Sequence, residues 1–283
     1  MLLTWTHEAL LRRIKLHKLL KPLPTDVVYI SRKGSEYKVI EYINKSKVLI
    51  EFQDEFKYKC WVSRQSALKG NVKNPFLKSV QGIGYMGIGK YKAKVDNKNT
   101  KAYSAWNDMF RRCYCPVQLK KNPTYTKCTV NEIWYNFQNF AEWFYSQPGH
   151  DLKWQLDKDL KVKGNTEYSP ETCTLLPFEI NVTLALHRGK KRDLPPGVHE
   201  SKDSGRYSGN LLIGDAKKGK FNYHNTPEEA FAEYKYFKEI RVKWLADKYK
   251  SLLKSETYDL LYEWEINIDD KGLYYYPEQK EEV

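Results

Sequence analysis

Residues 154–181, WQLDKDLKVKGNTEYSPETCTLLPFEIN, decide how the rest of the chain is interpreted. The pattern predicts a short strand over 154–160, a Gly-Asn turn, a Ser-Pro loop and a second short strand over 173–176. A helix is expected to open at Pro177, because proline is favoured at the first helical position. The stretch therefore predicts a strand, strand, helix unit with acidic residues on its first strand and Asn181 on its helix.

Asp157, near the end of the first strand, and Asn181 carry side-chain oxygens that we expect to converge. A hard divalent cation takes oxygen ligands, so the pair predicts one Mg²⁺ or Mn²⁺, with Asp159 as a second acidic ligand. A metal held there could polarise a phosphodiester and stabilise its leaving oxygen. The competing interpretation is a solvated, charged strand end, since Asp-x-Asp triplets are common.

The surrounding residues resemble the ββα-metal core of HNH (His-Me finger) endonucleases, in the form common in phage genomes. The positions that match are Leu156, Asp157, Lys158, Tyr168, Ser169, Pro170, Glu171, Cys173 and Asn181. The resemblance covers about residues 100–182 and implies metal-dependent cleavage or nicking of DNA. It also implies that Asp157, Lys158, Asp159 and Asn181 are the catalytic residues, and that Asp157 and Asn181 bind the metal.

Two departures from the family pattern leave catalysis open. Active members usually carry a His after the ligand Asp and an Asn before the Cys, where this chain has Lys158 and Thr172. A lysine with an ordinary pKa of about 10.4 is protonated at neutral pH and makes a poor base. Lys158 would act as a base only with a depressed pKa, and would otherwise clamp a phosphate.

The charge of the chain indicates a polyanionic partner. The net charge is +13, from 48 Lys and Arg against 35 Asp and Glu. Residues 255–283 hold nine acids and two bases, a net of −7, which leaves +20 on residues 1–254. A body this basic favours double-stranded DNA as the partner, with plain solubility as the alternative explanation.

The composition also indicates the cellular compartment in which the protein is expected. No stretch approaches about 18 uninterrupted apolar residues, so no membrane span is expected. The N-terminus lacks a small-residue cleavage site, so no secretory signal is expected either. Five cysteines, an odd number, fit a reducing cytosol. With the family resemblance, this predicts the cytoplasm of an infected bacterial host.

Four cysteines are candidates for a structural zinc site, which we do not expect to form. Their spacing differs from the C-x2-4-C knuckles that structural zinc favours. Buried thiols in aromatic-rich segments are ordinary core packing. The residues concerned are Cys113, Cys115, Cys128 and Cys173.

Upstream of the central unit, the sequence predicts a basic helix over 5–20 within an N-terminal segment 1–25. Residues 26–91 alternate short β runs with turns and predict a small antiparallel, SH3-like β-barrel. Its strands are expected over 27–29, 37–42, 48–52 and 56–62. The glycine-rich run over 81–90 is interpreted as a connecting loop, because no helix pattern follows it as a dinucleotide site requires.

Two aromatic stripes predict helices in front of the central unit and complete a domain over 100–187. Trp106 and Phe110 belong to the first stripe, and Ile133 and Phe137 to the second. We expect these stripes to form core rather than a ligand surface. Two arginines of the first helix, Arg111 and Arg112, are expected to project away from its stripe and meet phosphates.

A basic linker over 188–196 follows the central helix. It is expected to track a DNA backbone through counterion release, with a solvated connector as the alternative. Its candidate phosphate contacts are Arg188, Lys190, Lys191 and Arg192.

Residues 197–254 predict three short strands, over 197–201, 206–213 and 220–223, and then a helix. The helix should begin with a Thr-Pro-Glu-Glu capping box. This order resembles the ethylene-response-factor type of DNA-binding domain, whose sheet enters the major groove. The resemblance implies base or phosphate contacts by His199, Lys202, Arg206, Tyr207 and Asn210, and phosphate contacts by Lys217, Lys218 and Lys220. Arg206 is the candidate for a bidentate guanine contact.

The remaining segment, 255–283, is an acidic, aromatic tail in which alternation over 262–268 predicts a strand. The tail is expected either to shield the basic body or, like the barrel, to bind a host or phage protein. The sequence does not choose between these roles.

Together these patterns predict an α+β chain with a small N-terminal β-barrel, central helices plus a ββα-metal core, and a C-terminal three-stranded sheet with one helix. The leading hypothesis is a phage-encoded, HNH-like endonuclease of the homing or mobile-element type. The alternatives are an inactive, HNH-derived DNA-binding regulator, and a phage protein that binds and inhibits a host protein.

Overall fold

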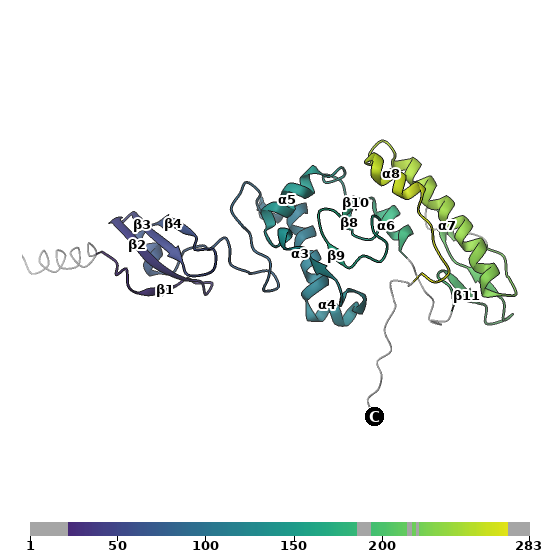
Figure 1. Cartoon of the computed structure of the whole chain (residues 1–283), viewed down its shortest axis with the longest axis horizontal. Coiled ribbons are helices and arrows are strands. Elements are labelled where there is room, and N and C mark those ends of the chain that lie inside the picture. The colour runs from purple at the N-terminus through teal and green to yellow at the C-terminus, as the bar shows by residue number, and fades with distance from the viewer. Residues whose placement is uncertain (1–21, 186–193, 214–216, 219–220, 271–283) are drawn as a thin grey trace, which may run out of the picture. The chain divides into compact units, whose positions relative to one another are not determined.

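The computed structural model describes residues 22–185, 194–213, 217–218 and 221–270, and it has the mixed α+β composition expected from the sequence (Figure 1). The predicted helix over 5–20 lies outside these ranges, and so do Arg188, Lys190, Lys191, Arg192 and Lys220. No helix in the described ranges is both long enough and apolar enough to cross a membrane.

The chain divides into two compact units. The first comprises residues 1–78 and 85–87, and the second residues 79–84 and 88–283. The six-segment division drawn from the sequence is finer than this and stays a prediction.

The first unit is built on a four-stranded antiparallel sheet in the order β1-β2-β3-β4. Its core is formed by inward-facing residues such as Tyr37, Ile50 and Phe52, none of which is exposed. The strands are β1 (Val28–Ile30), β2 (Glu36–Asn44), β3 (Lys47–Phe52) and β4 (Lys59–Val62), followed by helix α2 (Arg64–Leu68). With β1 and β4 at its edges, the described sheet is open, so closure into a barrel is not confirmed.

The fourth strand begins later than the sequence predicts because a turn occupies the residues before it. The Asp54 carboxylate accepts a hydrogen bond from the Phe56 amide at 3.1 Å, and Lys57 has a positive φ of 47°. These conformations are incompatible with an extended ladder.

The second unit starts with a hairpin, β5 (Lys94–Val95) and β6 (Lys98–Asn99), and a set of helices. The predicted aromatic stripes are confirmed as core, since Trp106, Phe110 and Phe137 are fully buried. Ile133 is an exception: it is 53% exposed and lies in a separate 3-10 turn, because Asn136 caps the following helix. The helical elements and their short strand are α3 (Lys101–Tyr114), α4 (Pro116–Lys121), η1 (Pro123–Tyr125), β7 (Thr129–Val130), η2 (Glu132–Tyr135) and α5 (Phe137–Ser146).

The central stretch folds as strand, strand, helix, as the sequence predicts. Strand β8 (Gln155–Asp157) pairs antiparallel with β10 (Thr174–Leu176), and α6 (Phe178–Leu184) follows. The intervening strand β9 (Glu167–Tyr168) pairs with β7 in parallel. Pro177 is the residue before the first helical turn rather than inside it.

The described C-terminal residues form two separate strand pairs and one long helix, where the sequence predicts three strands and a helix. Strand β11 (Val198–Glu200) pairs with β12 (Tyr207–Gly209), and β12 forms one further bridge to His224. Residues 221–223 are not in a strand, which corrects the third predicted strand. A separate pair joins β13 (Leu212–Ile213) to β14 (Lys217–Lys218). Helix α7 (Pro227–Tyr249) begins with the predicted capping box of Thr226 and Glu229.

Helix α7 packs along two different cores. Its first half buries Phe231 and Tyr234 against β11 and β12, and its second half buries Val242 and Leu245 against α6. The helix therefore ties the C-terminal strands to the central stretch.

The predicted strand over 262–268 is replaced by helix α8 (Ser255–Tyr262) and an irregular segment. The apolar alternation does not mark a strand face, because Trp264 and Ile266 pack in hydrophobic clusters whereas Tyr262 and Ile268 are exposed. Leu261 packs with α6 and α7, whereas Ile266 packs with the C-terminal strands.

Two glycines test how tightly α7 packs on the C-terminal strands. Gly197 and Gly205 both have a positive φ, of 75° and 64°, but only at Gly197 would an added Cβ overlap the Tyr234 ring. We expect Gly197→Ala to lower the free energy of unfolding by roughly 2–4 kcal/mol. Gly205→Ala, the matched control, should cost only about 1 kcal/mol. Urea unfolding followed by tryptophan fluorescence measures both, and equal costs would contradict this packing.

Candidate functional site

Asp157 ends strand β8 and caps the turn that follows it. Its Oδ1 accepts hydrogen bonds from the backbone amides of Asp159, at 3.0 Å, and Leu160, at 2.8 Å. The residue is only 9% exposed. Burial raises the pKa of the Asp157 carboxyl to about 6, although the two amide bonds oppose the shift. This cap explains why β8 is shorter than the strand predicted over 154–160.

Lys158 points into the protein and its ammonium is engaged there. Its Nζ donates to Asp159 Oδ1 and to the Asn165 carbonyl oxygen, both at 2.6 Å. It also lies 6.0 Å from the centre of the Tyr168 ring. Burial alone would lower the pKa of Lys158, but the Asp159 carboxylate outweighs it and the net shift is upward. Lys158 is therefore held protonated, which is the opposite of what a general base requires.

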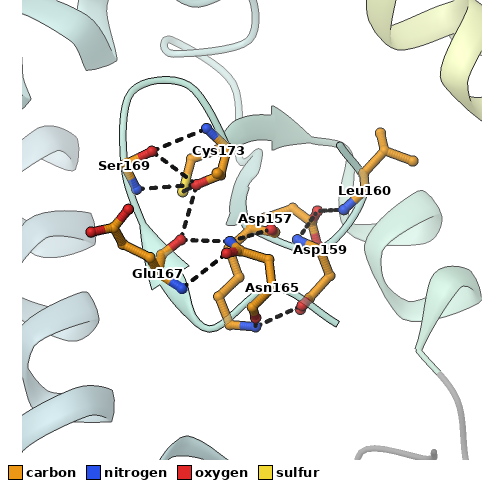
Figure 2. A network of polar contacts seen from close by, with 9 residues as sticks. Asp157, Asp159, Leu160, Asn165, Glu167, Ser169 and Cys173 are labelled. Carbon is orange, nitrogen blue, oxygen red and sulfur yellow. Dashed lines mark hydrogen bonds and ion pairs between the residues drawn. The ribbon is translucent and has the colours of Figure 1, made fainter. Parts of the chain in front are cut away.

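Asn165 closes the loop between β8 and β9 (Figure 2). Its amide nitrogen donates to the carbonyl oxygens of Lys158, at 2.9 Å, and Glu167, at 2.5 Å. Its Oδ1 accepts from the Glu167 amide at 3.0 Å. Because Lys158 Nζ bonds the Asn165 carbonyl in return, the two residues hold each other across the loop.

Thr172, the second departure from the family pattern, belongs to the same network. Its hydroxyl donates to the Glu167 carbonyl at 2.9 Å and accepts from the Ser169 amide at 3.2 Å. The Thr172 amide donates to Ser169 Oγ at 3.2 Å. These bonds form a compact Ser/Thr turn that leads into β10.

Asn181, on α6, contacts the same strand that carries Asp157. Its Nδ2 donates to Gln155 Oε1 at 2.7 Å. Gln155 and Asp157 are two residues apart on β8, so their side chains leave the same face of the strand. The structure thus connects Asn181 to β8 through Gln155, and the expected convergence of the Asp157 and Asn181 oxygens stays a prediction.

The arrangement does not fit a hydrated divalent ion. Mg²⁺ in proteins keeps several of its waters, and the nearly enclosed Asp157 carboxyl, with Oδ1 bonded to two amides, leaves little room for them. Across the residues that the structure describes, no three His, Cys, Asp or Glu side chains gather as a metal-binding group. Metal ligation by Asp157 and Asn181 stays a prediction.

Three of the four cysteines considered for zinc are buried: Cys113, Cys128 and Cys173. Burial raises the pKa of Cys113 and Cys173 to about 12, so these thiols are held protonated. Cys115 is half-buried.

The two arginines of α3 differ in placement. Arg111 is exposed and pairs with Asp108 at 3.2 Å. Arg112 is half-buried, with its guanidinium 6.0 Å from the Tyr125 ring centre, which corrects the expectation that it projects toward solvent. Burial would lower the pKa of Arg112, but interaction with Tyr168 and Tyr125 raises it. Arg112 therefore supports the packing of α3 on β9.

Most of the predicted base-contact residues are exposed on or beside the β11-β12 hairpin. His199, Lys202, Arg206 and Asn210 are all open to solvent, and Arg206 lies 5.7 Å from the Tyr223 ring centre. Tyr207 differs because it is half-buried and packs with the cluster under α7. Lys217 and Lys218 form the short strand β14.

The polar network of the central loop includes residues that sequence reasoning did not select. Gln155 and Asn165 are central to it, and Thr172 appeared only as a departure from a pattern. A signal was present for Asn165, since Asn after a turn glycine commonly bonds nearby backbone groups.

Comparison of the chain with known proteins assigns it to no family. No protein-family model, no curated protein and no solved structure matches the chain. The resemblances to HNH endonucleases and to ethylene-response-factor domains therefore stay hypotheses based on the residues named above.

The buried Asp157 carboxyl predicts a pH-dependent stability difference. Its pKa is raised from 3.8 to about 6, so the folded state binds the proton more tightly. The associated stability is present below about pH 4 and is lost as the pH rises through about 6. The variant Asp157→Asn keeps the oxygen that accepts both amide bonds but does not ionise.

The free energy of unfolding of Asp157→Asn, relative to that of the wild type, should therefore rise by up to about 3 kcal/mol from about pH 4 to pH 7. Urea unfolding at both pH values measures this, and a constant difference would refute it.

The buried Lys158 ammonium predicts a cost for its removal. Lys158→Met leaves the Asn165 carbonyl and Asp159 carboxylate without their donor, and should cost about 1–3 kcal/mol of stability. Lys248 is the matched control because it pairs with Glu179 at 2.6 Å in an exposed position. Lys248→Met should cost less than about 1 kcal/mol. Thermal unfolding of both variants gives the comparison, and equal losses would mean that Lys158 is not structural.

Proposed function

We propose that this chain is a phage-encoded DNA-binding protein, acting in the cytoplasm of the infected bacterium, whose central HNH-like unit is a scaffold. In this proposal residues 100–187 are the ββα unit, residues 197–254 are the ethylene-response-factor-like module, and residues 26–91 are an accessory β domain. The net charge of +20 on residues 1–254 supports a polyanionic partner. The exposed His199, Lys202, Arg206 and Asn210 support contact through the β11-β12 hairpin.

The observation that carries the scaffold proposal is the state of Lys158. It stands where active relatives of the proposed family carry their base, yet its Nζ is bonded to Asp159 and Asn165. Both bonds stabilise the protonated form and hold it away from solvent. A phosphate clamp would also require this ammonium to leave its internal partners. The contacts of Lys158 therefore fit a role in stabilising the loop better than a role in binding a substrate.

Endonuclease activity is the second candidate, and one observation favours it. Asn181 bonds Gln155, which lies two residues before Asp157 on β8, so the two predicted metal ligands belong to neighbouring elements. Cleavage by this route would need the Asp157 carboxyl to become accessible. Mg²⁺ or Mn²⁺ remains the cofactor proposed for that case.

The two candidates are separated by measuring binding and cleavage on the same samples. The full chain, Asp157→Asn and Lys158→His would each be incubated with plasmid and phage DNA in Mg²⁺, Mn²⁺ or EDTA. We expect all three proteins to shift DNA equally well in EDTA and none to cleave it. Asp157→Asn is the sharper control because it preserves both amide bonds while removing the charge.

Cleavage by the wild type that disappears in EDTA and in Asp157→Asn would overturn the scaffold proposal and establish the nuclease. A wild-type protein that neither shifts nor cleaves any duplex would overturn both candidates.

A further inference from the structure

A lysine-rich hairpin between the glycine-rich loop and α3 has no role in the functions discussed above. The segment 90–101 reads KYKAKVDNKNTK, with five lysines and one acid, and so carries a net charge of +4. It forms the antiparallel pair β5-β6, in which Lys94 lies opposite Asn99 and Val95 opposite Lys98. All residues of the two strands are exposed.

The tip of this hairpin has a defined conformation. Asp96 and Asn97 connect the strands with φ values of 49° and 59°. Two successive residues with positive φ match the type I′ turn, whose twist suits a two-residue hairpin loop. The hairpin is therefore a formed ribbon.

The base of the hairpin is fastened to the helices. The Thr100 amide donates to the Ala93 carbonyl at 2.9 Å. Tyr91 exchanges two bonds with the Gln138 side chain of α5, at 2.9 and 3.0 Å, and its ring stacks on Tyr145. This anchoring means that the ribbon is presented by a rigid support.

The five lysines fall into two groups. Lys90 pairs with Glu142 at 3.5 Å and Lys101 donates to the Asp151 carbonyl, so both contribute to the base. Lys92, Lys94 and Lys98 are exposed and, among the described residues, form no ion pair with an acid. Three cations concentrated on a small ribbon repel one another, which an anionic partner would relieve.

The distribution of these cations suits a nucleic-acid groove. Paired residues in an antiparallel ribbon share a face, so Lys94 and Lys98 emerge on opposite faces. The major groove of B-DNA admits a two-stranded β-ribbon, with a phosphate backbone along each wall. Lys94 on one face of the ribbon and Lys98 on the other can then reach the phosphates on the two sides of the groove.

We propose that the β5-β6 hairpin is a second DNA-contacting element, which lies in the groove of duplex DNA and places Lys92, Lys94 and Lys98 on phosphates. The proposal rests on the DNA-binding function proposed above and adds a contact outside the C-terminal module. These contacts are with the DNA phosphate backbone. The hairpin would therefore add affinity and help to position the protein on the duplex, without selecting a sequence.

The test is the salt dependence of binding to a short fluorescent duplex, measured by anisotropy with the full chain in EDTA. Each lysine-phosphate contact contributes about 0.9 to the slope of log Kd against log salt. Lys92→Ala/Lys94→Ala/Lys98→Ala should therefore reduce the slope by about 2.7 and weaken binding roughly 10- to 100-fold at low salt. The arginine triple Lys92→Arg/Lys94→Arg/Lys98→Arg should retain both slope and affinity.

The matched control removes three other exposed lysines of the same unit. Lys120→Ala/Lys121→Ala/Lys127→Ala loses the same charge, and its slope should change by less than about 1. An unchanged slope in the hairpin triple, or an equal fall in both triples, would overturn the proposal while leaving DNA binding intact. Absence of salt-dependent binding by the wild type would instead mean that the proposed DNA-binding function itself has failed.

Discussion

The buried carboxylate of Asp157 is the constraint on which the central part of the structure depends. Its Oδ1 accepts hydrogen bonds from two backbone amides where the chain leaves β8, and the next residue, Lys158, is buried and bonded within the same loop. A buried ammonium is tolerated only if it is paired and hydrogen-bonded. Asp159 and Asn165 meet that requirement, and Asn165 then fixes the conformation of the loop that reaches β9. One buried acid thus organises the chain from β8 to β9.

The two positions that depart from the HNH pattern are both part of this organisation. Lys158 bonds one side of the loop, and Thr172 bonds the Glu167 carbonyl on the other. A catalytic base needs a pKa near the working pH and a path to its substrate. Here the side chain at that position stabilises a loop, and its pKa is shifted away from neutrality. The contacts of Lys158 and Thr172 therefore stabilise the loop and do not prepare Lys158 to act as a base.

In the DNA-binding function proposed above, recognition would be carried by exposed elements that the core supports. Helix α7 spans two clusters, so the β11-β12 hairpin is fastened to the same body as the central stretch. Tyr91 and Gln138 fasten the β5-β6 hairpin to α5 in a comparable way. Rigid presentation of cations lowers the entropy lost when a phosphate backbone is bound. If the proposed DNA contacts form, they require no change in the buried residues around Asp157.

The sequence by itself determined the local elements: the strand, strand, helix order around Asp157, the capping box at Thr226 and the aromatic stripe through Trp106. These follow from periodicity and from cap and turn residues, which act over a few positions. Only the tertiary structure decided that Lys158 and Arg112 turn inward, that Ile133 lies outside the core stripe, and that residues 262–268 form no strand. Burial depends on partners distant in sequence, such as Asn165 for Lys158 and Tyr168 for Arg112, and no local pattern specifies them.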